Sequence, residues 1–428
     1  MSVSDIDFID ELCIGTVSRR AFMEKIAAAG AGVSLLAASA LGQEKPQPRP
    51  DAENPKYSPE NIGGGGRLER NFYRDWIRKS KVPMVEGYSI YDARDQEALP
   101  WPEIGGQGLY LNFSGNVHMD GVIVEIPPGK ALVPRRHLYE QLLYVLKGRG
   151  HTRLGETKNS PRVSWAEGSL FTVPLNAVHR HFNDDASHPA RILAVTTFPF
   201  MIQVFGNLGF IENSKAEFPE RFHGQSDFYS ASTQMHKRWW KTNYVPDLRS
   251  AKVIPWEERG KGNESVFWEM AGNTILEPHV SEFPVATYKL GHRHPYEAII
   301  LTLNGKGFSL FGRNGLRETD NPGKIDWKAG SIVSPPYFWY HQHFNTGDTK
   351  ARYWAITEGD FPKRLGIPLD VEQIEAPQED PGIKKRFERE LGHQMVGAIL
   401  PNPGLHHDHH HDHDHDHDHH HGDDHRHA

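Results

Sequence analysis

An internal repeat constrains the fold of this chain more than any other feature of its sequence. The segment RRHLYEQLLYVLKGRG, which begins at Arg135, superposes without a gap on HRHPYEAIILTLNGKG, which begins at His292, at an offset of 157 residues. A second block, WAEGSLFTVPLNAVHRHFN from Trp165, superposes on WKAGSIVSPPYFWYHQHFN from Trp327 at an offset of 162. Because the offset grows by five, we expect a short insertion in the second copy, in the turn between residues 312 and 324.

Each copy has the pattern of a β-rich unit. Short stretches of alternating or β-branched residues, such as 298–303 and 332–333, are separated by Gly, Pro and Asn-Gly. The chain has 428 residues, with 40 glycines and 30 prolines, so it is long enough for two such units. We therefore predict an all-β fold of two tandem barrels or sandwiches, with short flanking helices.

Charge and cysteine content exclude several classes of protein. The formal net charge is −7, and the last 23 residues contribute −6 of it through seven aspartates and Arg426. The rest of the chain is nearly neutral and has no basic stripe interleaved with aromatic residues, so we exclude nucleic acid as a partner. The only cysteine, Cys13, excludes a disulfide framework and a thiolate metal site in the body. Any metal bound there must use His, Asp or Glu.

The N-terminal segment has the features of an export signal. A twin-arginine motif at residues 18–23 precedes the apolar run 26–40, which ends in Ala-Ser-Ala. The run is about 15 residues long, short of the roughly 20 that span a bilayer, so no stable membrane span is expected. We predict a signal peptide at 1–40 that is read by the twin-arginine translocase, a periplasmic mature protein, and a linker at 41–66. A short buried helix is the alternative.

The C-terminal segment is an unusual tract of histidine and aspartate. From His406 onward it holds 13 of the 27 histidines, and no packed core can be built from it. Dense imidazole and carboxylate groups bind Zn, Ni, Cu or Co with little selectivity. We predict that residues 405–428 form a disordered metal-binding tail that scavenges or buffers metal. The interleaved aspartates argue against the alternative of a purification tag.

The two copies resemble the paired motifs of the cupins, G-x5-H-x-H-x3-E-x6-G followed by G-x5-P-x-G-x2-H-x3-N. In the second copy, His292 and His294 match the H-x-H pair and His341 matches the later histidine. The resemblance covers about Gly106 to Pro362 and implies two tandem jelly-roll-type β-barrels. The division it implies is an N-terminal arm at 67–105, cupin domain 1 at 106–200, a connector at 201–265, cupin domain 2 at 266–362 and a C-terminal flank at 363–404.

The second copy supplies three of the four usual cupin ligands. Residues two apart in a strand share a face, so His292 and His294 point into the barrel, where His341 from a distant strand can join them. Three imidazoles leave open coordination positions and suit Fe, Cu, Ni or Zn. The usual acidic position is Ala298, and the carboxylate lies one place earlier at Glu297. We predict a three-histidine site, and whether Glu297 replaces the missing acid is left open.

Strand parity extends the predicted site beyond the ligands. Tyr288 and Leu290 share the parity of His292, while Trp339 and His343 share that of His341. We therefore expect Trp339 to contact substrate, and we name His343, Glu297 and Tyr288 as candidate catalytic residues. His343 is either a general base or a group that orients a ligand, unless it is simply a histidine satisfied at the barrel mouth.

The first copy departs from the motif at two ligand positions. Arg135 replaces the first histidine and Gln141 replaces the acid, so only His137 and His179 remain as good ligands. A guanidinium repels a dication and cannot lose its proton, so we expect at most a weak second site at His137, Gln141 and His179. The first barrel would then mainly support the second. Alternatively, Arg135 binds a substrate carboxylate or pairs with Glu140.

The second-copy segment that begins at Asp326 resembles the gentisate dioxygenase group, which has three histidines and no acidic fourth ligand. That resemblance implies an Fe(II) centre acting on a small hydroxylated aromatic acid, with Mn, Cu, Ni and Zn as other candidate metals. The alternatives are a metal-dependent lyase or isomerase, and a periplasmic metal- or ligand-binding protein without turnover. We take a homodimer as the default assembly. We also expect a polar helix or loop at 225–242 and a short charged helix at 384–391.

Overall fold

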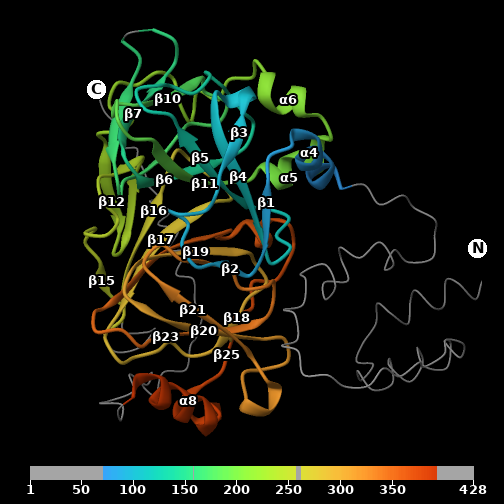
Figure 1. Ribbon diagram of the computed structural model, residues 1–428, viewed down its shortest axis with the longest axis vertical. Helices are drawn as coiled ribbons and strands as arrows, with labels where there is room; N and C mark the ends of the chain where they lie inside the picture. Colours follow the sequence, from blue (N-terminus) through green and yellow to red (C-terminus); the bar gives the residue numbers. More distant parts are fainter. Residues whose placement is uncertain (1–70, 158, 257–261, 393–428) are drawn as a thin grey trace, which may run out of the picture. The chain divides into compact units, whose positions relative to one another are not determined.

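The structure is a computed structural model that describes residues 71–157, 159–256 and 262–392 (Figure 1). The predicted signal peptide, the linker at 41–66 and the histidine-rich tail lie outside these residues. The described chain is mostly β-strand, arranged in four sheets with short helices, which confirms the predicted fold class. No helix in the described ranges is both long enough and apolar enough to cross a membrane.

The first half of the chain forms two sheets of mostly antiparallel strands. The larger has the order β1-β4-β5-β11-β6-β9-β14, with β3 on β4, and the smaller has the order β10-β7-β8. The strands are β1 (Met84–Gly87), β3 (Leu99–Trp101), β4 (Gly106–Phe113), β5 (Asp120–Ile126), β6 (Gln141–Lys147), β7 (Arg149–Leu154), β8 (Arg162–Ala166), β9 (Leu170–Thr172), β10 (His179–Asn183), β11 (Ala190–Thr196) and β14 (Tyr244–Val245).

The second half repeats this arrangement. Its larger sheet has the order β12-β13-β16-β17-β24-β19-β22-β2, with β15 on β16, and its smaller sheet has the order β21-β20-β23-β18-β25. The strands are β2 (Ser89–Ile90), β12 (Ser232–His236), β13 (Trp239–Thr242), β15 (Ile254–Pro255), β16 (Glu264–Glu269), β17 (Glu277–Phe283), β18 (His292–Arg293), β19 (Ala298–Asn304), β20 (Lys306–Gly312), β21 (Gly323–Lys328), β22 (Ile332–Val333), β23 (Tyr340–Asn345), β24 (Ala351–Thr357) and β25 (Glu372–Gln373).

Short helices flank the sheets. They are α4 (Phe72–Ser80), α5 (Phe198–Phe205), α6 (Leu208–Asn213), α7 (Phe361–Arg364) and α8 (Pro381–Leu391), with 3-10 turns at Pro102–Ile104, Glu318–Asp320 and Ala376–Gln378. Helix α8 contains the predicted helix at 384–391 and packs Ile383 and Phe387 on the second half. Asn71 and Asp380 cap α4 and α8 by accepting backbone N–H groups, as expected for residues at helix N-termini.

The predicted insertion in the second copy is confirmed by strand register. Arg149 pairs with Ala166 in the first half, and Lys306 pairs with Lys328 in the second, so the additional five residues lie between β20 and β21. The turns that precede β7 and β20 contain Gly148 and Gly305, whose φ angles are +89° and +86°. Glycine is favoured at both turns because side chains with a Cβ rarely adopt this conformation.

The arm and the connector take part in the sheets of both halves. The arm adds β1 in parallel to β4 and then β2 to β22 of the second half, while the connector adds β13 in parallel to β16 and then β14 to β9 of the first half. The prediction of a polar helix or loop at 225–242 is therefore wrong, because this segment contains β12 and β13. In β13, Trp239 stacks on Phe267 and Trp240 packs against the apolar core, an alternation typical of a strand.

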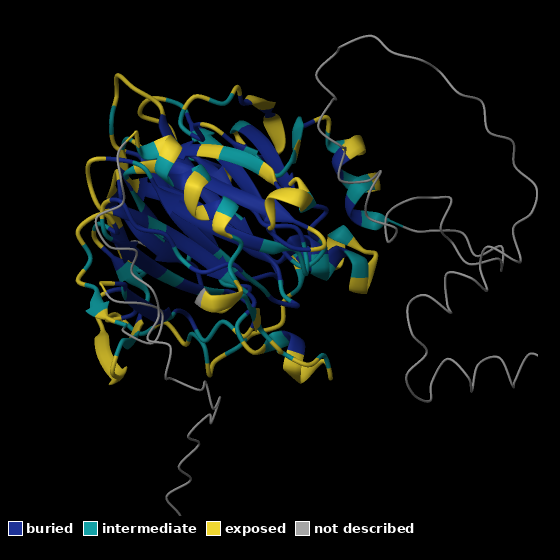
Figure 2. Cartoon of the chain, turned by 90° about the horizontal axis from the view of Figure 1, so that it is seen from below, coloured by how far each residue is buried: buried dark blue, intermediate teal, exposed yellow. Residues whose placement is uncertain are grey.

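The two larger sheets share one apolar core. Side chains from β4, β5, β6 and β11 pack with side chains from β16, β17, β19 and β24, and the ring of Trp354, which is fully buried, lies 5.7 Å from that of Tyr144. Figure 2 shows that buried residues follow the strands, whereas exposed residues lie mainly in loops and helices. The halves are therefore joined by hydrophobic burial, the dominant favourable term in folding.

A reciprocal pair of glutamates also joins the halves. The carboxylate of Glu140 accepts the backbone N–H groups of residues 274–276, with N···O distances of 2.6, 2.9 and 3.0 Å. The carboxylate of Glu297 accepts those of residues 117–119 at 2.6, 3.1 and 3.0 Å. Both the glutamates and the two loops are related by the repeat offset of 157. We call these contacts the reciprocal clasp.

Candidate metal centre

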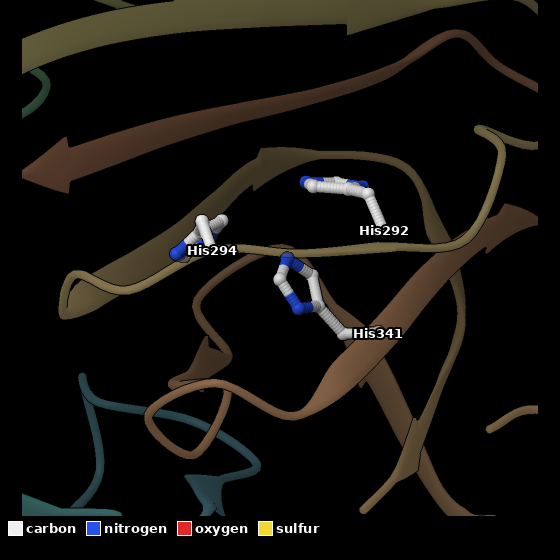
Figure 3. A group of neighbouring side chains, drawn as sticks. All are labelled: His292, His294 and His341. Carbon is white, nitrogen blue, oxygen red and sulfur yellow. The ribbon is translucent and has the colours of Figure 1, made fainter. Parts of the chain in front are cut away.

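The structure brings together the three histidines that the sequence predicts as ligands. His292 lies in β18 and pairs in register with His341 of β23, and His294 follows β18 directly. The ring centroid of His341 lies 4.3 Å from that of His292 and 4.9 Å from that of His294. One ligand atom from each residue lies within 4.8 Å of the other two. Figure 3 shows the His341 ring rising from β23 toward the segment that carries the other two rings.

Hydrogen bonds to the backbone fix the tautomer of each ring. Every ring places Nδ1 near the carbonyl oxygen of a residue two positions away. The three contacts are His292 to Leu290 (3.2 Å), His294 to Tyr296 (2.9 Å) and His341 to Trp339 (3.1 Å). A carbonyl oxygen can only accept, so Nδ1 carries the hydrogen and the neutral ring presents an unprotonated Nε2. Metal-binding histidines are usually oriented in this way.

The electrostatics of the site suit a cation. Burial lowers the pKa of His341 to about 4, so its ring is neutral at pH 7 and does not have to lose a proton to bind a metal. Two of the three residues are buried and His292 is half-buried. Three oriented imidazoles, with no protein carboxylate among them, fit a divalent transition metal and leave coordination positions for small ligands.

Glu297 does not approach the three histidines. Its side chain turns toward the first half, where it is only 2% exposed and forms one side of the reciprocal clasp. Burial and the charge of the neighbouring Glu358 raise the pKa of Glu297 above its usual range. Glu297 therefore supplies no fourth ligand in this arrangement, because its carboxylate oxygens are held by the backbone N–H groups of residues 117–119 in the first half.

Tyr288 and Trp339 also lie away from the three rings. The hydroxyl of Tyr288 donates to Glu379 at 2.5 Å, and its ring packs against Phe344 and Phe387. Trp339 packs near Tyr88, at a centroid distance of 6.1 Å. Strand parity misplaced Tyr288 because β18 contains only two residues, and Tyr288 joins β23 through an isolated bridge before β18 begins.

A cavity of about 340 Å³ opens on the three histidines. One wall is aromatic: Trp239 stacks on Phe267 at 4.8 Å, and Phe267 stacks on His279 at 4.6 Å. Arg238 lies over the ring of Trp256 at 4.7 Å and completes this wall. This wall was not predicted from the sequence. The Trp-Trp pair of the connector was a signal for it, because in a strand the two side chains point to opposite faces and one of them can reach the cavity.

Two polar groups of the cavity can interact with a substrate. The Lys289 ammonium donates to the Tyr353 hydroxyl at 2.6 Å, and both residues line the cavity. Glu277 also lines it, and burial together with the charge of Asp360 raises the pKa of Glu277 to about 7. A carboxyl group with this pKa can give or take a proton near neutral pH. The sequence alone did not single out either residue.

His343 lines the cavity as expected, and its hydrogen bonds define its role. Its Nδ1 lies 2.7 Å from the Ser309 hydroxyl, which also accepts the indole N–H of Trp327 at 3.0 Å. The buried hydroxyl satisfies its own hydrogen best by donating it to Nδ1, which leaves His343 with an Nε2–H. Burial lowers the pKa of His343 well below its usual value. In this tautomer His343 can donate a hydrogen bond through Nε2, whereas its Nδ1 is occupied.

The equivalent positions of the first half do not form a comparable site. The Arg135 guanidinium pairs with Glu212 at 2.7 Å and with the Tyr139 hydroxyl at 3.0 Å, rather than with Glu140. The two histidines are adjacent, with a centroid distance of 5.1 Å between His137 and His179, and His137 Nε2 lies 3.2 Å from Gln141 Oε1. The described residues place no third His, Asp or Glu ligand atom within reach of both rings. Arg135 already has an internal carboxylate partner.

Part of the first half matches a known domain family. Residues 122–196 match the cupin domain family, and this segment lies in the first half. Similar solved structures include salicylate 1,2-dioxygenase from Pseudoaminobacter salicylatoxidans, at 12% identity over 62% of this chain and 81% of that chain, with a TM-score of 0.46. Oxalate decarboxylase from Bacillus subtilis matches at 13% identity over 73% of this chain and 88% of that chain, with a TM-score of 0.44. Residues 122–196 are thus similar to a cupin domain, and the second half repeats the strand order of the half in which this segment lies.

Proposed function

We propose that this protein is a metal-dependent oxygenase of the periplasm, a non-haem Fe(II) dioxygenase that acts on a hydroxylated aromatic or related small oxygenated acid. The observation that carries the proposal is the convergence of three oriented imidazoles on a cavity with an aromatic wall. His292, His294 and His341 would hold the metal. Mn, Cu, Ni and Zn remain alternatives that the same three nitrogens suit.

The metal and the protein would contribute different parts of the chemistry. A bound Fe(II) supplies Lewis acidity toward substrate oxygens and the capacity to activate dioxygen at a neighbouring position. The residues of the protein would position the substrate, donate hydrogen bonds to it and accept a proton from it. A cavity of about 340 Å³ is within the usual size range for small-molecule sites.

The walls of the cavity favour a planar acid. A flat ring can stack against Trp239, and a substrate carboxylate can pair with the ammonium of Lys289. The Nε2–H of His343 can donate to a substrate oxygen, while Glu277, with a pKa of about 7, can accept a proton from a substrate hydroxyl. Proton uptake by Glu277 would help a phenolic substrate bind as the oxyanion.

Oxygen consumption by the Fe(II)-loaded full-length chain tests the proposal directly. With a panel of hydroxylated benzoates, we expect substrate-dependent oxygen uptake that falls more than 100-fold in His341→Ala. The exposed histidine His188 provides a matched control, and His188→Ala should retain full activity. Metal binding that depends on His341 but is accompanied by no turnover would instead indicate a binding protein. Turnover of substrate without oxygen uptake would indicate a lyase or isomerase.

A further inference from the structure

A second group of potential ligand atoms lies where the two halves meet. It comprises His118, Glu297 and Glu358, whose ligand atoms lie within 4.8 Å of one another. The carboxylate of Glu297 already accepts three backbone N–H groups, and these dipoles direct positive charge toward the place that a cation would occupy. Glu358 Oε2 accepts a further backbone N–H. We therefore interpret the group as a hydrogen-bonded cluster and not as a metal site.

One peptide group connects this cluster to the three histidines. The carbonyl of Tyr296 accepts the Nδ1–H of His294 at 2.9 Å, the shortest of the three ligand-to-carbonyl contacts. The N–H of the same peptide, at Glu297, donates to Glu358 Oε2 at 2.6 Å. Hydrogen bonds on both sides of a peptide polarise it, and each strengthens the other. A continuous path thus leads from His294 to Glu358, whose side chain is fully buried.

We infer that Glu358 is a positioning residue for the metal centre and acts on His294 through the Tyr296–Glu297 peptide. The inference rests on the proposed metal site. By accepting the peptide N–H, the carboxylate makes the carbonyl a stronger acceptor for Nδ1–H. That contact holds the ring in the required tautomer and makes Nε2 a better electron donor to a metal.

The repeat provides an internal comparison. In the first half, His137 Nδ1 contacts the carbonyl of Tyr139 at 2.9 Å, so the histidine end of the path is the same. The next peptide N–H, at Glu140, donates to the neutral hydroxyl of Thr197 at 3.0 Å. A carboxylate occupies this position in the half that has three ligand histidines, and a threonine occupies it in the half that lacks them.

The first half fixes the orientation of Glu358. Its His118 places Nδ1 2.5 Å from Glu358 Oε1, and the His118 ring packs edge-on against Phe200 and Phe361. The clasp between Glu297 and residues 117–119 holds the same loop against the second half. The first half therefore contributes to the metal centre by orienting a carboxylate that lies two hydrogen bonds away from a ligand.

Metal affinity measured on the full-length chain tests this inference. Co(II) is titrated into the wild-type chain and followed by its visible absorption, and the His341→Ala chain is the blank that subtracts metal bound elsewhere, including the tail. We expect Glu358→Gln to weaken the His341-dependent Co(II) affinity about 10- to 100-fold, the usual effect of losing an outer partner of a ligand. Thr197→Ala, the matched variant in the first half, should change it less than twofold.

A spectroscopic signal separates a positioning role from a merely structural one. The ring N–H protons of Co(II)-bound histidines give strongly shifted signals in ¹H NMR spectra recorded in H₂O, and we expect one of the three to move in Glu358→Gln. Unchanged affinity together with three unchanged signals would overturn the inference. If Glu358→Gln does not fold, the variant His118→Gln is measured in its place. A His341-dependent Co(II) affinity at least threefold weaker than that of the wild type supports the path from Glu358 to His294, and an unchanged affinity overturns it. Absence of any His341-dependent binding in the wild type would instead refute the proposed metal site.

Discussion

The reciprocal clasp allows a quantitative test of how the two halves are joined. In Glu140→Gln the amide oxygen can still accept a backbone N–H, but the amide NH₂ replaces the oxygen that faces residues 275 and 276. Glu140 is 5% exposed, so the two N–H groups that lose their acceptor cannot turn to water. A buried donor left unsatisfied costs about 1–3 kcal/mol, so the expected loss is about 2–6 kcal/mol. Domains are stable by only about 5–15 kcal/mol, which makes this a large fraction of the total.

Urea unfolding followed by tryptophan fluorescence measures this loss, because both halves contain buried tryptophans. The matched control is Glu156→Gln, a substitution of an exposed glutamate in the same half that should change the free energy of unfolding by less than about 0.5 kcal/mol. We also expect Glu140→Gln to unfold over a broader range of urea concentrations than the wild type, because the two halves are then less strongly coupled. A change in Glu140→Gln no larger than that in Glu156→Gln would refute the reasoning, because the buried N–H groups would then have found other acceptors.

Three further predictions concern the pH dependence and the cavity, and a fourth concerns the tail. Burial raises the pKa of Asp120 from 3.8 to about 7, so the folded state binds its proton more tightly and the wild type loses stability as pH rises from about 4 to 7. The free energy of unfolding of Asp120→Asn, measured in urea, should therefore rise by about 2–4 kcal/mol relative to that of the wild type between pH 4 and 8. A difference between the two proteins that stays constant with pH would contradict this. If Glu277 accepts a proton, kcat/KM should rise with pH through about 7, and this inflection should vanish in Glu277→Gln, as steady-state kinetics will show. Trp239→Ala should raise KM about 3- to 10-fold with little change in kcat, because an aromatic contact contributes about 0.5–1.5 kcal/mol; an unchanged KM would exclude stacking on this ring. Deletion of residues 406–428 should lower the metal bound per chain in elemental analysis while leaving the His341-dependent part, and an unchanged stoichiometry would contradict a metal-binding tail.

The sequence predicted the parts of this protein that rest on periodicity and repetition. The two-unit all-β fold, the insertion before β21 and the grouping of His292, His294 and His341 all follow from the repeat, because equivalent segments must form equivalent strands. The connector was harder to predict. Its strands β12 and β13 are short, and β13 joins the second half by pairing with β16, a contact that no local pattern specifies.

Side-chain direction outside regular strands was the second source of error. Tyr288 was assigned to the cavity by counting in twos from His292, but the chain between them forms no continuous strand, so the count does not apply. Glu297 was considered as a ligand because it lies one place before Ala298, the position of the usual acidic ligand. Its actual partners are backbone N–H groups about 180 residues away, which the sequence does not reveal until the two halves are packed together.

Strand β2 pairs with β22 of the second half, and β14 pairs with β9 of the first half. This exchange of strands determines how the chain responds to cleavage between the halves. A single copy of the repeat would have one strand without a sheet and one sheet with a vacant edge, so two separate copies could complete each other only as a strand-exchanged pair. The chain therefore contains, within one polypeptide, the equivalent of a domain-swapped dimer. Proteolysis at the exposed residues 215–217 would break the covalent link between the halves, while each half still held a strand of the other. The two fragments would stay associated, and His118 would remain beside Glu358.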